Sequence, residues 1–260
     1  MAGCAIRAEA GPAPSAPVHP IDAPGTSEAA WRAWPGLASL PAVSVAGWAS
    51  AVIFAAHPDD EVLGAGGIIA LLAAAGARLR VVAVTDGEAS HPGRTAPQRT
   101  ELARQRAEER TAALDALGAR GTEVIRLGLP DTGLGGREAE LAALVPDLAA
   151  GFTVCLAPWL SDLHGDHEAV GRAARRATGR VLFYPVWMWH WARPGDPRVP
   201  WRRAERVLLP DGARDRKRAA VRCFASQLAD RGDGAGPVLT EEFAAHFDRG
   251  HEVLFPAARP

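Results

Sequence analysis

The chain of 260 residues is poor in cysteine. It contains only Cys4, Cys155 and Cys223, and no two of them are spaced as CxxC. An odd number of widely separated cysteines does not suit a disulfide framework, and it lacks the paired thiolates of a structural zinc site. Any metal that this chain binds must therefore be held by histidine and carboxylate side chains.

The sequence also lacks a long hydrophobic run and an excess of charge. Its longest apolar stretch, Ala65 to Ala77, is interrupted by glycine, whereas a membrane-spanning helix needs about 20 apolar residues. The 29 Lys and Arg residues balance 30 Asp and Glu residues, which gives no electrostatic reason to expect a nucleic-acid or membrane partner. The N-terminal residues show neither the basic start nor the apolar core of a secretory signal, so we expect a cytoplasmic protein.

Apolar residues make up 48% of the chain, which is enough for a substantial core. Residues 1–26 are an exception because they are rich in Ala and Pro and show no periodicity, which predicts a flexible arm. Residues 27–260 contain no internal repeat and no second domain boundary. We expect them to form a single catalytic α/β domain.

Strand-like and helix-like segments alternate from Ser50 onwards. The predicted strands are SAVIFAAH, ARLRVVAV, TEVIRLGL, FTVCLAP, RVLFYPVW, ERVLLP and HEVLFP. The predicted helices are Leu63–Ala77, Gln98–Leu117, Glu138–Ala150, His167–Thr178, Ala213–Leu228 and Glu241–Phe247. This alternation predicts right-handed crossovers and a mostly parallel sheet with helices on both faces. Ligands of such sheets bind beyond the carboxyl ends of the strands, so the polar residues that follow the strands should converge there.

Two clusters of histidine and aspartate follow predicted strands, HPDD from His57 and HGDH from His164. Each alone is explained equally well as a helix N-terminus with acidic residues in its first turn. Two such clusters at the same edge of one sheet favour a metal site. Catalytic zinc commonly takes three protein ligands, and His57, Asp60 and His167 can form that set.

This arrangement predicts a metal-dependent hydrolase. One divalent ion, Zn²⁺ or another divalent metal, would lower the pKa of a bound water, and Asp59 would accept its proton during attack on an amide or ester carbonyl. Protonated His164 would stabilise the oxyanion and protonate the departing amine. Asp166 would orient the His164 imidazole and favour its charged form.

The motifs resemble those of the PIG-L (LmbE-like) family, zinc-dependent enzymes with a Rossmann-like fold that deacetylate N-acetylglucosaminyl compounds. The resemblance is carried by AAHPDDEVLGAGG and the later HGDH, and it extends from about Ser50 to at least Val186. The resemblance implies a role for each of five residues. His57, Asp60 and His167 would be zinc ligands, Asp59 the general base, and His164 the acid or oxyanion stabiliser.

Two weaker matches to the family concern substrate binding. Arg106 resembles the arginine of an RxxE helix that contacts the sugar, and an exposed ion pair with a Glu one turn away explains it equally well. Asp131 in LGLPDTG resembles an acidic residue that binds sugar hydroxyls, with an ordinary turn residue after Pro130 as the alternative.

Tryptophan recurs at every second position at Trp187, Trp189 and Trp191, so an extended chain would place the three rings on one face. Burial in the core is the ordinary role of such a face. A proline-rich segment and Trp201 follow, however, and indole rings also stack on sugars and flat ligands. We therefore expect Trp189 and Trp191 to form part of a pocket wall.

The sequence thus predicts a zinc hydrolase that removes an N-acetyl or other N-acyl group from an N-acylglucosaminyl moiety of a small molecule, such as a glycosylated natural product. An amidase of a thiol or other amide conjugate is the alternative within the same chemistry. A two-His-one-carboxylate iron oxygenase using His164 and Asp166 is the alternative of another class, but it leaves HPDD unexplained. The sequence gives no indication of oligomeric state.

Overall fold

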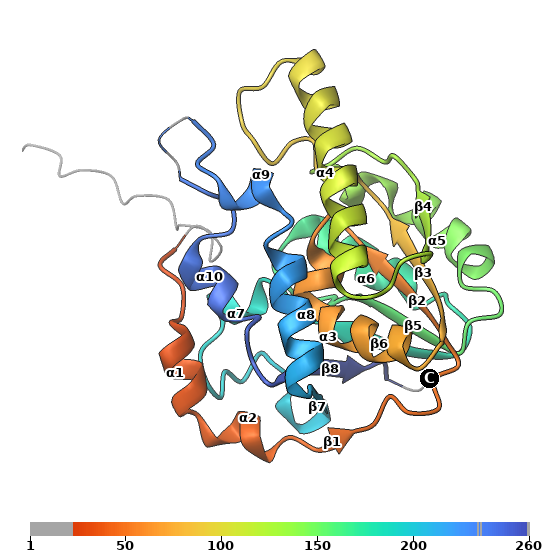
Figure 1. The fold of residues 1–260 in the computed structure, drawn as a ribbon, viewed down its shortest axis with the longest axis vertical. Coiled ribbons are helices and arrows are strands. Elements are labelled where there is room, and N and C mark those ends of the chain that lie inside the picture. The colour runs from red at the N-terminus through yellow and green to blue at the C-terminus, as the bar shows by residue number, and fades with distance from the viewer. Residues whose placement is uncertain (1–22, 233, 235, 259–260) are drawn as a thin grey trace, which may run out of the picture.

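The structure is a computed structural model that describes residues 23–232, 234 and 236–258 (Figure 1). Cys4 and residues 1–22 of the predicted arm lie outside these residues. At the end of the predicted arm, Thr26 donates hydrogen bonds to the carbonyl oxygens of His190 and Ala192. None of the helices in the described range combines the length and hydrophobicity needed to span a bilayer.

A sheet of eight strands forms the centre of the described residues, in the order β1-β7-β8-β6-β5-β2-β3-β4. The strands are β1 (Ala42–Val43), β2 (Ser50–Ala55), β3 (Arg78–Ala83), β4 (Glu123–Arg126), β5 (Val154–Pro158), β6 (Arg180–Tyr184), β7 (Glu205–Leu208) and β8 (His251–Pro256). Strands β2 to β6 pair in parallel, and β8 pairs antiparallel with both β6 and β7. The predicted α/β fold with a mostly parallel sheet is confirmed.

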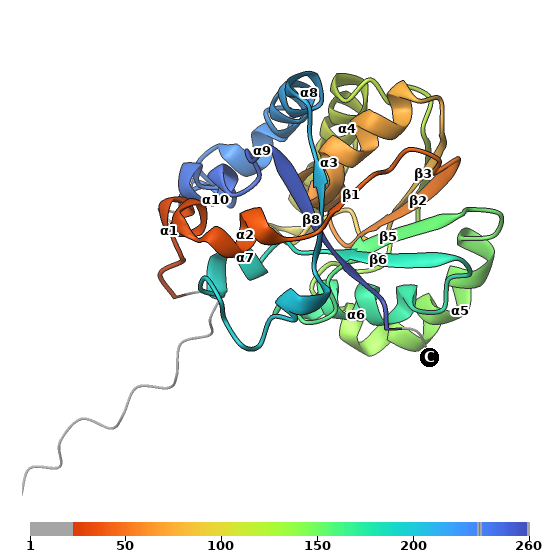
Figure 2. The ribbon, with the colours of Figure 1, turned by 90° about the horizontal axis from the view of Figure 1, so that it is seen from below.

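Helices cover both faces of the sheet. The helices are α1 (Glu28–Ala33), α2 (Pro35–Ser39), α3 (Asp60–Ala74), α4 (Ala96–Ala116), α5 (Glu138–Leu148), α6 (Gly165–Ala174), α7 (Met188–Trp191), α8 (Asp211–Val221), α9 (Ala225–Leu228) and α10 (Glu241–Ala245), with short 3₁₀ turns at Leu134–Arg137 and Trp201–Arg203. Figure 2 shows α3, α4 and α8 on one face and α5 and α6 on the other.

Strand β2 lies in the middle of the core. Its residues 51–55 and the following Ala56 are completely buried, as expected of a strand that has helices on both faces. Burying each large apolar side chain, such as Ile53 or Phe54, contributes roughly 1.5–3 kcal/mol. The end of β2 is therefore firmly placed, and the HPDD segment that follows it starts from a rigid position.

Two predictions of local structure are wrong. The strand predicted in RVLFYPVW ends at Tyr184, since Pro185 has no N–H for a sheet hydrogen bond, and the chain then turns into α7. The single helix predicted over 213–228 is divided into α8 and α9, because Phe224 between them has ψ of 59°, outside the helical region.

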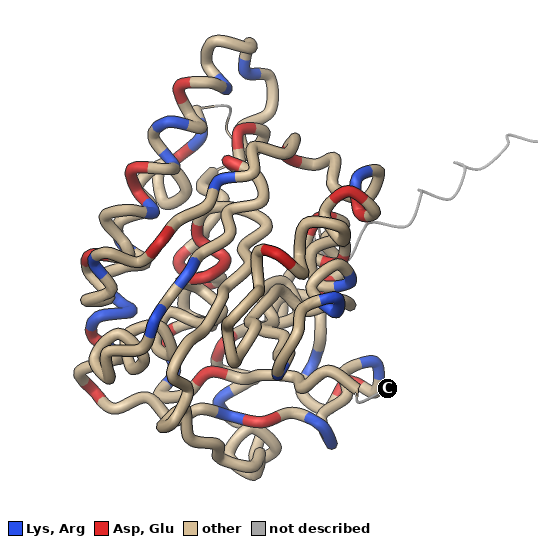
Figure 3. Tube along the Cα trace, turned by 90° about the vertical axis from the view of Figure 1, so that its right-hand side faces the viewer, with Lys and Arg blue, Asp and Glu red and all other residues tan. Residues whose placement is uncertain are grey.

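Acidic and basic residues are interspersed along the face shown in Figure 3. On α4, for example, the exposed Arg104 forms ion pairs with both Glu101 and Glu108. Exposed pairs of this kind contribute little to stability and neutralise each other locally.

Candidate active site

The two histidine and aspartate motifs meet at one edge of the sheet. HPDD follows β2 and leads into α3, HGDH follows β5 and leads into α6, and β2 and β5 are hydrogen-bonded neighbours. Asp59 has a φ of 137°, an uncommon conformation for a residue other than glycine. Strained residues of this kind are concentrated at functional sites, and this one turns the chain abruptly into α3.

Asp60 lies between two imidazoles. Its Oδ1 is 3.2 Å from Nε2 of His167, and its Oδ2 is 3.4 Å from Nδ1 of His57. Ring nitrogens of His57, His164 and His167 all lie within 4.8 Å of one another. The three side chains expected as metal ligands are therefore close enough to contact a common ion.

The donor atoms of this cluster suit a divalent metal. Nε2 of His167 is buried and, apart from its 3.2 Å approach to Oδ1 of Asp60, has no hydrogen-bond partner among the described residues. Leaving a buried polar atom unpartnered is unfavourable, and a metal ligand position removes that cost. Imidazole nitrogen and carboxylate oxygen are ligands that zinc accepts, so His57, Asp60 and His167 fit the expected ion.

Asp162 supports His167 from the side away from Asp60. Its Oδ2 accepts a hydrogen bond from Nδ1 of His167 at 2.8 Å, and its oxygens also accept from the backbone N–H groups of Trp187 and Met188. A carboxylate on one imidazole nitrogen leaves the other nitrogen free to bind a metal. Sequence reasoning missed Asp162, and its only signal was an aspartate in the loop before HGDH.

Asp131 and Asp166 support His57 in the same way. Nε2 of His57 lies 3.1 Å from Oδ1 of Asp131 and 3.3 Å from Oδ2 of Asp166. Burial opposes the charged form of His57, but hydrogen bonds to these carboxylates raise its pKa well above the ordinary value. Burial likewise opposes ionisation of Asp131, yet His57 lowers the pKa of that carboxyl to about 2.

The expected role of Asp166 needs correction. Asp166 accepts hydrogen bonds from His57 and from the backbone N–H groups of Thr132 and Leu134, and it forms none with His164. Burial and the neighbouring charges of His167 and His57 lower the pKa of His164 to about 3, although the Asp166 charge acts in the opposite direction. The prediction that Asp166 orients the His164 imidazole is therefore wrong, whereas its charge does favour the protonated imidazole, as predicted.

Arg106 holds Asp59 and is buried, so the alternative of an exposed helix charge is wrong. Its Nη2 donates to Oδ2 of Asp59 at 3.0 Å and to the Pro58 carbonyl oxygen at 2.6 Å. Its Nη1 donates to the carbonyl oxygen of Gly87, where φ is +65° and a Cβ atom would lie 1.9 Å from Nη1. Burial raises the pKa of Asp59 to about 7, while the Arg106 charge lowers it.

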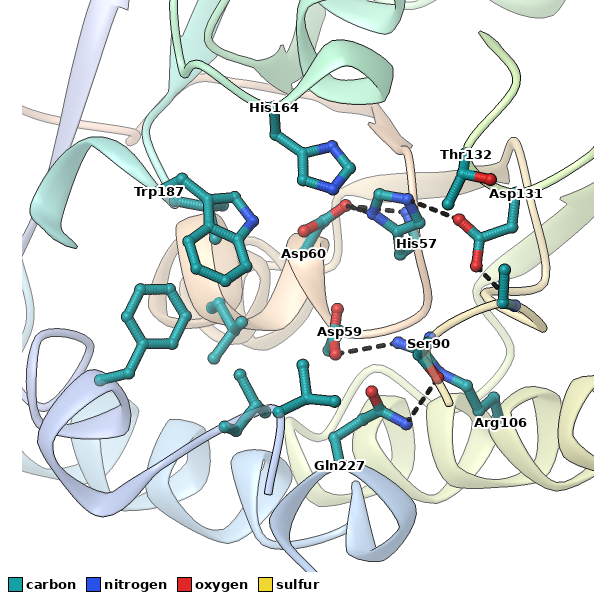
Figure 4. Close-up of a pocket in the computed structure, with 16 residues that line it drawn as sticks. His57, Asp59, Asp60, Ser90, Arg106, Asp131, Thr132, His164, Trp187 and Gln227 are labelled. Carbon is teal, nitrogen blue, oxygen red and sulfur yellow. Dashed lines mark hydrogen bonds and ion pairs between the residues drawn. The ribbon is translucent and has the colours of Figure 1, made fainter. Parts of the chain in front are cut away.

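A cavity of about 140 Å³ lies over these groups and has two unlike walls (Figure 4). One wall, here called the polar wall, is formed by Ser90, Arg106, Asp131 and Gln227. Its apolar lining, here called the apolar wall, consists of Leu63, Val186, Trp187, Leu239 and Phe243, and Trp187 lies across the cavity from Arg106 and Asp131 (Figure 4). His57, Asp59, Asp60 and His164 lie between the two walls.

Trp187, rather than Trp189 or Trp191, lines this cavity. Its indole stacks on the His164 ring at 6.1 Å and on the Phe243 ring at 4.8 Å between centroids. Trp189 is buried, packs edge-on against Trp31 at 5.1 Å, and has the guanidinium of Arg249 over its face.

Trp191 also points away from the cavity. Its ring is parallel to that of Trp159, and its Nε1 donates to the Asp162 carbonyl oxygen at 3.0 Å. The residues of α7 are helical, so successive rings point in different directions and not to one face. The prediction that Trp189 and Trp191 form a wall of the pocket is wrong for this reason.

Comparison with solved structures supports the fold. The zinc-inhibited form of the teicoplanin deacetylase Orf2 is 18% identical with a TM-score of 0.59, over 80% of this chain and 97% of that chain. The N,N'-diacetylchitobiose deacetylase of Pyrococcus horikoshii is 20% identical with a TM-score of 0.53, over 70% of this chain and 72% of that chain. The deacetylase Dbv21 of the A40926 pseudoaglycone is 22% identical with a TM-score of 0.51, over 82% and 99%.

Comparison of sequences gives the family. A search of curated proteins finds no significant match. Residues 52–178, however, match the family described as PIG-L: GlcNAc-PI de-N-acetylase, and this range includes both HPDD and HGDH. Residues 52–178 of this chain are therefore a domain of the PIG-L family.

Proposed function

We propose that the protein is a metal-dependent deacylase that hydrolyses the amide bond of an N-acylglucosaminyl compound. The observation that carries the proposal is the position of Asp59 and His164 on either side of His57 and Asp60, the latter 3.2 Å from His167 (Figure 4). The name of the matching family and the names of the similar structures, which are deacetylases of chitobiose and of glycopeptide compounds, support the same reaction.

His57, Asp60 and His167 would hold one divalent cation, and Zn²⁺ suits their nitrogen and oxygen atoms. When bound, the cation supplies a positive charge that polarises the amide carbonyl and lowers the pKa of the attacking water. Asp162 and Asp131 keep the two imidazoles in the required tautomers.

Asp59 acts as the general base in this proposal. Its carboxylate, held by Arg106, takes a proton from the attacking water, and its pKa of about 7 suits a group that must also release the proton. The same carboxyl then protonates the amide nitrogen, because an unprotonated amine anion is a very poor leaving group. The His164 imidazole donates an N–H hydrogen bond to the oxyanion.

The two walls of the cavity orient the scissile amide. In a trans amide, the substituents on the carbonyl carbon and on the nitrogen point in opposite directions. Sugar hydroxyls fit the polar wall, where charged and amide groups are available. The acyl group then lies against the apolar wall, next to Trp187 and Phe243.

The proposal is tested by measuring amine release from N-acylglucosaminides with and without a chelator. The wild-type protein should release amine, lose activity with the chelator and regain it with Zn²⁺. Asp59→Asn should keep the metal and lose roughly 10²- to 10⁴-fold in kcat. His167→Ala should lose the metal itself. Arg104→Gln, an exposed change on α4, should alter neither the metal content nor kcat. Undiminished turnover in metal-free protein would contradict the proposal.

The alternative substrates are tested in the same assay. Amide conjugates of thiols are the second candidate class, and preferential turnover of these would replace the sugar in the proposal. The iron oxygenase gains no support from the site, because His164 and Asp166 fall in different groups of candidate ligands: His164 with His57 and His167, and Asp166 with His57 and Asp131.

A further inference from the structure

Gln227 contributes an unpartnered acceptor to the polar wall. The side chain is completely buried, and its Oε1 has no hydrogen-bond partner among the described residues. In Figure 4 this oxygen points toward Asp59, while Nε2 points toward Ser90. Gln227 belongs to α9 and lies outside residues 52–178, so the family match assigns it no role.

A chain of hydrogen bonds fixes the orientation of the Gln227 amide. The Glu109 carboxylate accepts hydrogen bonds from the backbone N and the Oγ of Ser226, both at 2.7 Å. An ionised carboxylate can only accept, so the Ser226 hydroxyl donates its proton to Glu109. Its oxygen is then an acceptor for Nε2 of Gln227 at 2.8 Å. Flipping the amide would place Oε1 against an oxygen without a proton to give, so Oε1 must face the cavity.

None of the described residues donates a hydrogen bond to this oxygen, although the Nε–H of Arg106 also has no partner. The nearby guanidinium of Arg106 already donates to the carbonyl oxygens of Gly87 and Pro58 and to Asp59. Asp59 and Gln227 therefore present two acceptors on one side of the cavity. A buried carbonyl oxygen without a donor is unfavourable, and a ligand that brings an O–H or N–H group there is favoured.

We propose that Oε1 of Gln227 accepts a hydrogen bond from the amine half of the substrate, the half that leaves as the amino sugar. This inference rests on the proposed deacylase function and makes Gln227 a specificity-determining residue. The donor is an O–H or N–H group, and it has two sources: a ring hydroxyl beside the acylamino carbon, or the scissile amide N–H. A site built around such an acceptor discriminates strongly against analogues that lack the donor.

The test compares Gln227→Met, which preserves side-chain length and removes the acceptor, with the wild type on three substrates. These are an N-acetylglucosaminide, its 3-deoxy analogue, and the corresponding O-acetyl ester, which lacks the amide N–H. The wild type should discriminate against one analogue, and Gln227→Met should reduce that discrimination at least about tenfold. Loss of discrimination in the 3-deoxy arm identifies the hydroxyl, and loss in the ester arm identifies the N–H. Each rate is expressed as a mutant-to-wild-type ratio for the same substrate, so that the higher intrinsic reactivity of the ester cancels.

Two further variants separate recognition from folding. Ser226→Ala leaves the Gln227 side chain in place but removes the contact that fixes its amide, so it should also reduce the discrimination. Gln105→Met removes a donor to Glu109 on the exposed side of α4 and should leave the discrimination unchanged. Metal content and thermal melting report whether each variant is folded.

The outcomes distinguish this inference from the proposed function. If Gln227→Met and Ser226→Ala both release amine and keep the wild-type discrimination against each analogue, the role of Gln227 is wrong and the deacylase function stands. If the wild type releases acetate from none of the three substrates, both proposals are overturned.

Discussion

Oδ2 of Asp162 lies 2.8 Å from Nδ1 of His167, at the centre of a group of backbone N–H donors at the start of α7. One carboxylate therefore binds both a candidate metal ligand and the segment that carries Trp187. Because Trp187 belongs to the apolar wall, the metal site and the substrate pocket share a common support.

Asp162→Asn should weaken zinc binding about 10- to 100-fold, the usual effect of losing such a carboxylate partner. The reason is that the asparagine amide no longer favours the His167 tautomer that leaves Nε2 free. Competition with a chromogenic chelator measures the affinity. Zinc affinity equal to that of the wild type would show that Asp162 serves only to hold α7.

Arg106→Gln should move the acid limb of the kcat/KM profile to higher pH. The guanidinium favours the ionised form of Asp59, so its removal raises the pKa of that carboxyl, and a higher pH is needed to ionise the base. The pH dependence of amine release measures the shift, with Arg104→Gln on the exposed side of α4 as the control. An acid limb that stays in place or moves to lower pH would contradict the role given to Arg106.

Phe243→Ala should change which acyl groups are accepted. Trp187 and Phe243 stack at 4.8 Å and form part of the apolar wall, and truncation of a buried Phe leaves space that the structure fills only partly. The ratio of N-hexanoyl to N-acetyl turnover should therefore rise about tenfold. Phe247→Ala is a matched control, because Phe247 is similarly buried and contacts Phe243 from outside the cavity. Equal ratios in the two variants would mean that the acyl group lies elsewhere.

Glu28→Gln should alter stability in a pH-dependent way. Glu28 is buried in α1 and accepts hydrogen bonds from His246 and Arg249; burial opposes its ionisation, but these partners lower its pKa to about 2. Because folding lowers the pKa of Glu28, its ionised carboxylate stabilises the fold at pH values above the ordinary pKa. This stabilisation is lost as the pH falls toward 2. Chemical unfolding should show Glu28→Gln to be less stable by about 2 kcal/mol at neutral pH, with the difference shrinking below about pH 5. A difference independent of pH would exclude the ion pair as its cause.

The sheet and the metal cluster were predictable because their signals are local. The apolar run of β2 stops at Pro58, and the residues after it must then lie at the carboxyl end of a buried strand. The same reasoning applies to HGDH after β5. The sequence order alone therefore brings His57, Asp60 and His167 to one place.

The supporting residues were not predictable from local signals. The contact of Asp162 with α7 joins segments separated in the sequence by β6, and no spacing rule indicates it. The position of Asp166 two residues after His164 predicts a contact between them, but residues two apart at a helix start do not face each other. The alternation that predicts Trp189 in the pocket holds only in an extended chain, and Pro185 ends the strand before Trp189 is reached.

The position of β8 between β6 and β7 also affects how the chain assembles during synthesis. The segment made of β1 and β7 is joined to the parallel strands only through β8, which is later in the chain than every other strand described. The five strands β2 to β6 can pair with one another before residues 251–256 leave the ribosome. His57 and Asp60 follow β2, and His167 follows β5. Until then, β6 and β7 both expose unpaired edges, and a chain cut short before His251 keeps both open to aggregation.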